Sequence, residues 1–148
     1  MKKLIFFLLL SGAGLALASQ IGYKNIRYMD MDGDLADEII IEGRHSAGTG
    51  HYIEDLRIFR DEYPNLKLVF SVRTLDSYFA GKDYNYDIVS EVKFGEQTPA
   101  NKGARDIIVR SKKVFYKDNE HKVIEREEKL ADKAYKWNGT VFEEMPGE

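Results

Sequence analysis

Residues 30–41 of the chain read DMDGDLADEIII, an acidic segment that runs directly into an apolar triplet. Carboxylates occupy five of the first nine positions, and they repel one another strongly unless a cation lies among them. Calcium suits such a loop because it is a hard cation that takes about 6–8 oxygen ligands, often from alternate residues. The apolar triplet predicts a buried strand that anchors the loop.

The spacing of the acidic residues suggests which of them would bind the ion. Three aspartates alternate, so a tight loop can turn their carboxylates toward one point. Asp37 and its neighbour are adjacent where the strand begins and point to opposite faces, so only one of them would reach the ion. We predict a calcium site with carboxylate ligands and one main-chain carbonyl, formed by Asp30, Asp32, Asp34, Ala36 (the carbonyl) and Glu38. A solvated acidic turn without metal is the alternative.

This segment resembles the calcium loop of FG-GAP and VCBS repeats, the integrin-type propeller motif. The pattern of that motif is Asp-x-Asp/Asn-Gly-Asp-Gly-x-x-Asp followed by an apolar strand, and the match covers residues 30–41. Leu35 stands where the motif has its second glycine, and Glu38 replaces its last aspartate. If position 35 requires a positive φ, a residue other than glycine costs about 1–2 kcal/mol there. The resemblance implies a calcium-binding β-protein.

The first 18 residues have the features of an export signal. A basic start at Lys2-Lys3 precedes an apolar run, and Ala16-Leu17-Ala18 fits a signal-peptidase cleavage site. The apolar run is shorter than the roughly 20 residues that a membrane-spanning helix needs. We expect residues 1–18 to be removed, which leaves a mature chain of residues 19–148 without a membrane anchor, in the periplasm or outside the cell.

Composition narrows the class of partner. The chain has no cysteine, so neither a disulfide nor a lipid-modified cysteine contributes to its stability or anchoring. Without Lys2 and Lys3, the mature chain carries a net charge of −5. Because this charge argues against nucleic acid and anionic membranes as partners, we expect a protein or a glycan.

Alternating apolar and polar residues recur along most of the chain and predict β-strands. Residues 52–59 and 66–72 alternate in this way, and Asn138-Gly139 between two apolar segments predicts a hairpin. Residues 124–136 also fit a helical stripe, but the hairpin that follows them favours strand. We predict an all-β, mainly antiparallel fold of about eight strands in a single domain, arranged as a sandwich or a small open propeller-like barrel.

An internal repeat is also consistent with the sequence. A shift of 68 residues sets Glu38-Ile39-Ile40-Ile41 over Asp106-Ile107-Ile108-Val109, which suggests two blade-like units. The second unit lacks the acidic ligands, so only the first would bind metal. Chance recurrence of apolar triplets is the alternative.

A second polar segment, residues 43–52, reads GRHSAGTGHY and predicts an adaptable loop. The order of elements in this region is an acidic turn, an apolar strand, this loop and a strand that begins with tyrosine. This order resembles that of periplasmic lysozyme inhibitors. Those inhibitors are all-β proteins that insert such a loop into the cleft of the enzyme. The resemblance implies a partner-binding loop at Arg44, His45, Ser46, Gly48, Thr49, Gly50 and His51. A plain hairpin connection is the alternative.

Patterns typical of enzymes are weak. His45 and His51 lack the spacing of zinc ligands, and Ser46 lacks the Gly-x-Ser-x-Gly elbow of hydrolases. We therefore predict a non-catalytic, exported, calcium-binding module of the FG-GAP/VCBS kind that binds a protein or a glycan. The alternatives are a periplasmic inhibitor of a lysozyme-like, peptidoglycan-cleaving enzyme and a small secreted hydrolase that uses residues 43–52.

Overall fold

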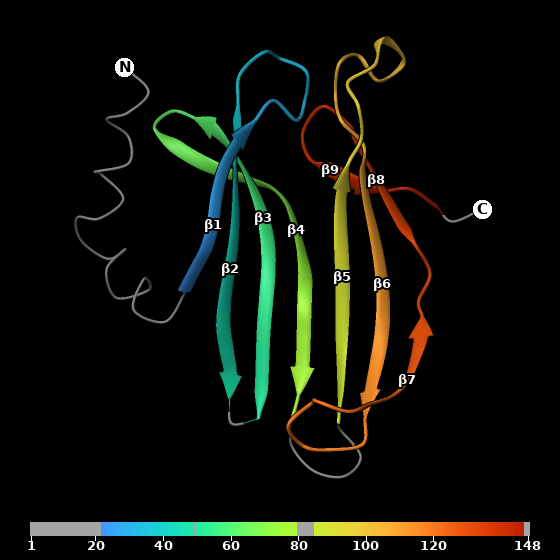
Figure 1. Cartoon of the computed structure of the whole chain (residues 1–148). Coiled ribbons are helices and arrows are strands. Elements are labelled where there is room, and N and C mark those ends of the chain that lie inside the picture. The colour runs from blue at the N-terminus through green and yellow to red at the C-terminus, as the bar shows by residue number, and fades with distance from the viewer. Residues whose placement is uncertain (1–21, 49, 80–84, 147–148) are drawn as a thin grey trace.

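A computed structural model describes residues 22–48, 50–79 and 85–146, with only the backbone described for residues 45–48. The predicted signal peptide, residues 1–18, and Thr49 lie outside these residues. Nine strands follow one another along the described chain (Figure 1): β1 (Gly22–Met29), β2 (Glu38–Gly48), β3 (His51–Glu62), β4 (Asn65–Tyr78), β5 (Tyr86–Phe94), β6 (Ile107–Tyr116), β7 (Ile124–Lys129), β8 (Lys133–Trp137) and β9 (Phe142–Glu144). A short 3-10 helix, η2 (Pro99–Asn101), lies between β5 and β6.

All nine strands belong to one antiparallel sheet, which confirms the predicted all-β, antiparallel fold. The strand order is β1-β2-β3-β4-β5-β6-β8-β9, and β7 pairs with β6 beside β8. Over the described residues the sheet does not close into a barrel. None of the described residues form a helix with the length and hydropathy needed to cross a bilayer.

The sheet consists of two four-stranded meanders, β1–β4 and β5-β6-β8-β9, joined by a short seam. Strand β4 pairs with β3 along its whole length but with β5 only over Leu75–Tyr78. Beyond this seam β4 curves away from β5, as Figure 1 shows. The two meanders therefore diverge toward the end of the sheet that carries the β1–β2 and β5–β6 loops.

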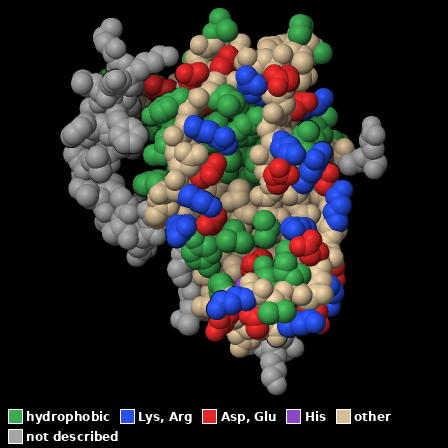
Figure 2. All heavy atoms as spheres, viewed as in Figure 1, with side chains coloured by type: hydrophobic (Ala, Val, Ile, Leu, Met, Phe, Trp, Pro, Cys, Tyr) green, Lys and Arg blue, Asp and Glu red, His purple; other side chains and the backbone are tan. Residues whose placement is uncertain are grey.

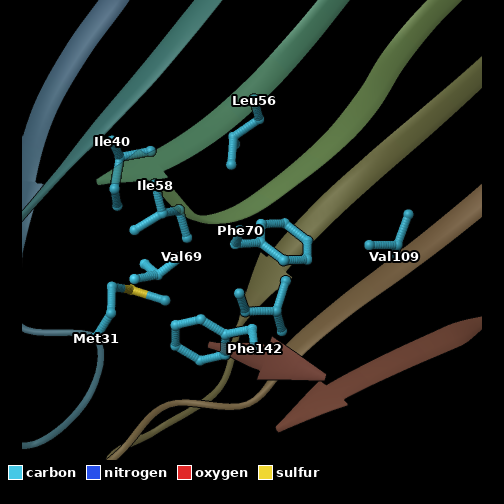
Figure 3. Close-up of a cluster of buried hydrophobic side chains, with 9 residues drawn as sticks. Met31, Ile40, Leu56, Ile58, Val69, Phe70, Val109 and Phe142 are labelled. Carbon is cyan, nitrogen blue, oxygen red and sulfur yellow. The ribbon is translucent and has the colours of Figure 1, made fainter. Parts of the chain in front are cut away.

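The hydrophobic core contains side chains from both meanders (Figure 3). Ile58 and Phe70 come from the first meander, and Phe142 comes from the last strand of the second. The Phe70 ring meets the Phe142 ring edge-on, with 6.1 Å between centroids. Met31, which belongs to the acidic loop, is fully buried in the same cluster. Because burial of such a side chain contributes about 1.5–3 kcal/mol, Met31 anchors the loop to the core.

The structure bears on three features that were predicted from the sequence. Residues 124–136 form β7 and β8, so strand rather than helix is correct there. Asn138-Gly139 lies in the turn between β8 and β9, where Gly139 has a φ of 98°. The shift of 68 residues does not preserve the buried face: Ile40 is buried in β2, whereas its counterpart Ile108 is only half-buried in β6. The two meanders share a topology, but this sequence offset does not align their cores.

The predicted loop at residues 43–52 is mostly strand. Strand β2 continues to Gly48 and β3 begins at His51, with His45 opposite Ile53 and a register shift between Ser46 and Gly48. Gly50, with a φ of 78°, supplies the left-handed conformation that a tight turn needs. Glycine and serine therefore mark a bulged hairpin end here, not a long loop.

Candidate metal centre

The acidic loop, residues 30–38, is folded by hydrogen bonds from its own backbone to its own carboxylates. The Asp30 carboxylate accepts from the N–H of Gly33 at 2.8 Å and of Leu35 at 3.2 Å. The N–H of Ala36 donates to Asp34 at 2.8 Å. At the end of the loop, Glu38 accepts from the N–H of Met31 at 2.7 Å. These charge-assisted bonds satisfy backbone donors that have no strand partner, and they fix the direction of the carboxylates.

Two loop positions adopt left-handed backbone conformations. Gly33 has a φ of 84° and Leu35 a φ of 70°. The positive φ at Leu35 is the condition under which the sequence predicted strain at this position. The side chain of Leu35 is 91 % exposed, so no packing interaction offsets that cost.

The β5–β6 loop holds the acidic loop in place. The N–H of Arg105 donates to the carbonyl of Met31 at 2.9 Å, and Nε of Arg105 donates to the carbonyl of Asp30 at 3.1 Å. A Cβ atom on Gly33 would lie 2.6 Å from the carbonyl carbon of Gly103 and 2.7 Å from the carbonyl oxygen of Lys102. The two backbones therefore approach so closely that only glycine fits at position 33.

This arrangement brings three of the predicted ligands together. Carboxylate oxygens of Asp30, Asp32 and Glu38 all lie within 4.8 Å of one another. Glu38 is 2 % exposed and Asp32 is 8 % exposed, so both carboxylates are largely withdrawn from water. Burying carboxylates this close together is costly unless a cation or a proton offsets their charge.

The protonation of the group reflects this cost. Burial raises the pKa of Glu38 to about 7, and the negative charges of Asp32, Asp34 and Asp30 act in the same direction. The hydrogen bond from the N–H of Met31 lowers this pKa but does not cancel the rise. Burial also raises the pKa of Asp32. Near neutral pH the group therefore binds a proton readily, and a metal ion would compete for the same oxygens.

Asp34 is not one of the three grouped carboxylates, and both Asp34 and Ala36 line the cleft beside the group. The Asp34 carboxylate contacts Arg60 on β3, with 2.8 Å between Nη2 and Oδ2. The same guanidinium lies 3.2 Å from Asp32 and over the Trp137 ring, at 5.7 Å from the centroid. The bond from Ala36, followed by the contacts with Arg60, keeps the pKa of Asp34 below its usual value. Arg60 thus supplies one positive charge to a loop that has five negative ones.

The donor set fits a hard divalent cation. All the grouped ligands are carboxylate oxygens, which calcium prefers, and their net charge exceeds what Arg60 neutralises. Next to the group, an acidic cleft of about 260 Å³ is lined by Asp34, Ala36, Asp37, Glu38, Arg60, Asp61 and Glu62. This cleft offers a route by which an ion could reach Glu38.

The structure places the other predicted site at the opposite end of the sheet. His51 at the start of β3 bonds Asp76 at 2.5 Å and stacks on Tyr78, so it is part of a packed cross-strand contact. Arg44 is exposed and lies over the Tyr52 ring. The side chains of His45 and Ser46 lie outside the described residues, and Gly48 is described by its backbone alone.

Three contributors to the metal centre were not predicted from the sequence. Arg60, Gly103 and Arg105 are distant from the acidic loop along the chain, and each acts through a tertiary contact. Arg60 lies on the same face of β3 as Leu56 and Ile58. This alternation was the one feature of the sequence that could have indicated that Arg60 points toward the core side of the sheet. For Gly103 and Arg105 no local pattern could have indicated the contact.

Comparisons of the chain with protein-family models, with curated proteins and with solved structures give no match. The resemblance of the acidic loop to FG-GAP and VCBS repeats therefore stays a prediction from residues 30–41.

Proposed function

We propose that this protein is a non-catalytic, exported β-domain that binds calcium through its acidic loop and uses the stabilised loop end to bind a protein or a glycan. The observation that carries the proposal is the group of carboxylate oxygens from Asp30, Asp32 and Glu38 within 4.8 Å, two of them on largely buried side chains. A divalent cation would offset the repulsion among these charges.

The surroundings of the loop favour a binding surface at this end of the molecule. Leu35 and Tyr63 are 91 % and 89 % exposed. Each directly adjoins, in sequence, residues that line the acidic cleft. Tyrosine is enriched at protein interfaces, where its ring supplies apolar contact area. By fixing the backbone at Leu35, calcium would hold one of these side chains in a defined position.

Thermal unfolding in calcium and in chelator tests the metal part of the proposal. A ligand that binds only the native state stabilises it by about 2.7 kcal/mol at a hundredfold excess over Kd. We expect calcium to raise Tm by several degrees, and magnesium to raise it less because magnesium requires stricter octahedral geometry. Identical transitions in calcium and in chelator would contradict the proposal.

A pull-down with the purified protein, with and without calcium, tests the partner. We expect a protein or polysaccharide that is retained in calcium and lost in chelator. The variant Tyr63→Ser should reduce retention while leaving the calcium-dependent rise in Tm unchanged. Retention that is indifferent to both calcium and Tyr63 would place the partner elsewhere on the surface.

A further inference from the structure

A pocket in the described part of the molecule lies away from the candidate metal centre, where the two meanders separate. It has a volume of about 340 Å³ and is lined by side chains from β1 to β5. Its apolar residues are Leu56, Leu75, Val89 and Val92. Binding sites for small molecules typically have about 300–1,000 Å³ and combine an apolar lining with a few polar groups. This pocket has the size of a small-ligand site, and four apolar and five charged residues lie among those that line it.

The charged residues of the pocket are not equally engaged. Lys24 lies 3.0 Å from Glu54, and Asp55 lies 2.7 Å from Arg57. Arg27 differs because no hydrogen bond joins its guanidinium to a described residue. Its Nη2 lies 3.5 Å from Glu42, which is an ion pair without a hydrogen bond, and its Nε is buried without a partner.

The guanidinium of Arg27 is held at the pocket by packing. Its Cζ lies over the Phe94 ring of β5, at 5.0 Å from the centroid, so the side chain reaches across from β1 to the second meander. Arginine has five N–H donors in a planar fork that matches a carboxylate. Only Nε is buried without an acceptor, and the Arg27 side chain as a whole is 40 % exposed, so its outer N–H donors are accessible to an incoming anion. Arg27 is therefore positioned to recognise an anionic group.

We propose that this pocket binds a small molecule with a carboxylate at the end of an apolar chain. The carboxylate pairs with Arg27, and the chain lies against Leu56, Leu75, Val89 and Val92. A singly charged head group suits the pocket better than a phosphate does, because Glu42, Glu54 and Asp55 also line it. Figure 2 shows one face of the molecule, on which charged side chains of both signs are interspersed with hydrophobic ones.

Calorimetric titration with octanoate tests the proposal, with acetate and 1-octanol as probes for the head group and the chain alone. We expect octanoate to bind at least tenfold more tightly than either. Arg27→Gln should weaken octanoate at least tenfold. Glu42→Gln should strengthen it severalfold, because it releases Arg27 from its ion pair and removes a repelling charge. Arg110→Gln, which changes an exposed arginine on β6 outside the lining, is the matched control and should bind as the wild type does.

Two results would overturn the proposal: no binding of octanoate to the wild type, or equal affinity in Arg27→Gln and wild type. Circular dichroism tests whether Arg27→Gln is folded. If it is not folded, the other measurements decide. Carboxylate recognition by Arg27 would be excluded if 1-octanol bound as tightly as octanoate, or if Glu42→Gln left the affinity for octanoate unchanged.

Discussion

The β1–β2 loop and the β5–β6 loop lie at the same end of the sheet and contact each other, yet different groups accept their backbone hydrogen bonds. In the β1–β2 loop the acceptors are the carboxylates of Asp30, Asp32, Asp34 and Glu38. In the β5–β6 loop the acceptors are a hydroxyl and backbone carbonyls. The N–H of Asn101 donates to the hydroxyl of Thr98, and the N–H of Gly103 donates to the carbonyl of Thr98.

This difference distinguishes the proposed cation-binding loop from the loop that supports it. Neutral acceptors fix a loop without leaving excess charge, so the β5–β6 loop is complete by itself. Charged acceptors fix the backbone equally well but concentrate negative charge that Arg60 only partly neutralises. A cation would therefore offset the excess negative charge of the first loop. The second loop provides the surface against which the first loop is held.

The largest effect is expected where the two loops touch. Gly33→Ala should destabilise the protein by about 3–5 kcal/mol, because the new Cβ meets backbone atoms at 2.6–2.8 Å and φ is positive. Gly103→Ala should cost only about 1–2 kcal/mol, since its nearest contact is 3.4 Å and only the conformational strain remains. Urea unfolding measures both. Equal losses in the two variants would refute the close approach of the backbones at Gly33.

The next effect concerns calcium itself. Glu38→Gln keeps the acceptor for Met31 but removes a charge, and it should abolish most of the calcium-dependent stabilisation of about 2.7 kcal/mol. Asp106→Asn in the β5–β6 loop is the matched control and should leave that stabilisation intact. Calorimetry of each variant in calcium and in chelator provides the comparison. Full stabilisation retained in Glu38→Gln would remove Glu38 from the ligand set.

Substitutions of the aspartates should weaken calcium binding to different degrees, according to their position in the loop. Asp30→Ala should weaken calcium severely, Asp32→Asn modestly because it keeps an oxygen, and Asp37→Ala hardly at all. The sequence places Asp34 among the ligands, which implies a severe loss for Asp34→Ala as well. Since Asp34 contacts Arg60 outside the group of three, we now expect an intermediate loss, and a calcium titration of the four variants tests that order.

Without metal, the protein should lose stability as pH rises. Glu38 binds a proton more tightly in the folded state, with a pKa of about 7, than its ordinary value of 4.5 allows in the unfolded chain. The associated stability is complete below about pH 4.5 and is lost as pH passes 7. Between pH 5 and 7 the loss should be about 2 kcal/mol in chelator. Urea unfolding across this range measures it, and Glu38→Gln should flatten the profile.

The smallest effect is expected from relief of strain. Leu35→Gly should stabilise the protein by about 0.5–1 kcal/mol or leave it unchanged, because the gain at φ 70° is partly offset by greater freedom in the unfolded chain. Lys102→Gly in the second loop, at φ 53°, should behave alike. A loss of stability on thermal unfolding of Leu35→Gly would mean that the exposed leucine makes a stabilising contact.

The local features of the fold could be predicted from the sequence, whereas its tertiary contacts could not. Alternation placed the strands at residues 52–59 and 66–72, and the acidic pattern placed the loop at residues 30–38. Those signals act between near neighbours. The divergence of β4 from β5, and the contacts of Arg60 and Arg105 with the loop, depend on how distant strands curve and pack, which no periodicity encodes. The pocket around Arg27 was missed for the same reason.

The bond between Arg105 and the carbonyl of Asp30 joins residues 75 positions apart, which has a consequence for the order of folding events. Contacts that close so long a loop carry a high entropic cost before they form, so they tend to be made late. Interactions absent from the folding transition state affect the rate of unfolding far more than the rate of folding. This bond should therefore lengthen the lifetime of the native state while leaving the speed of its formation almost unchanged.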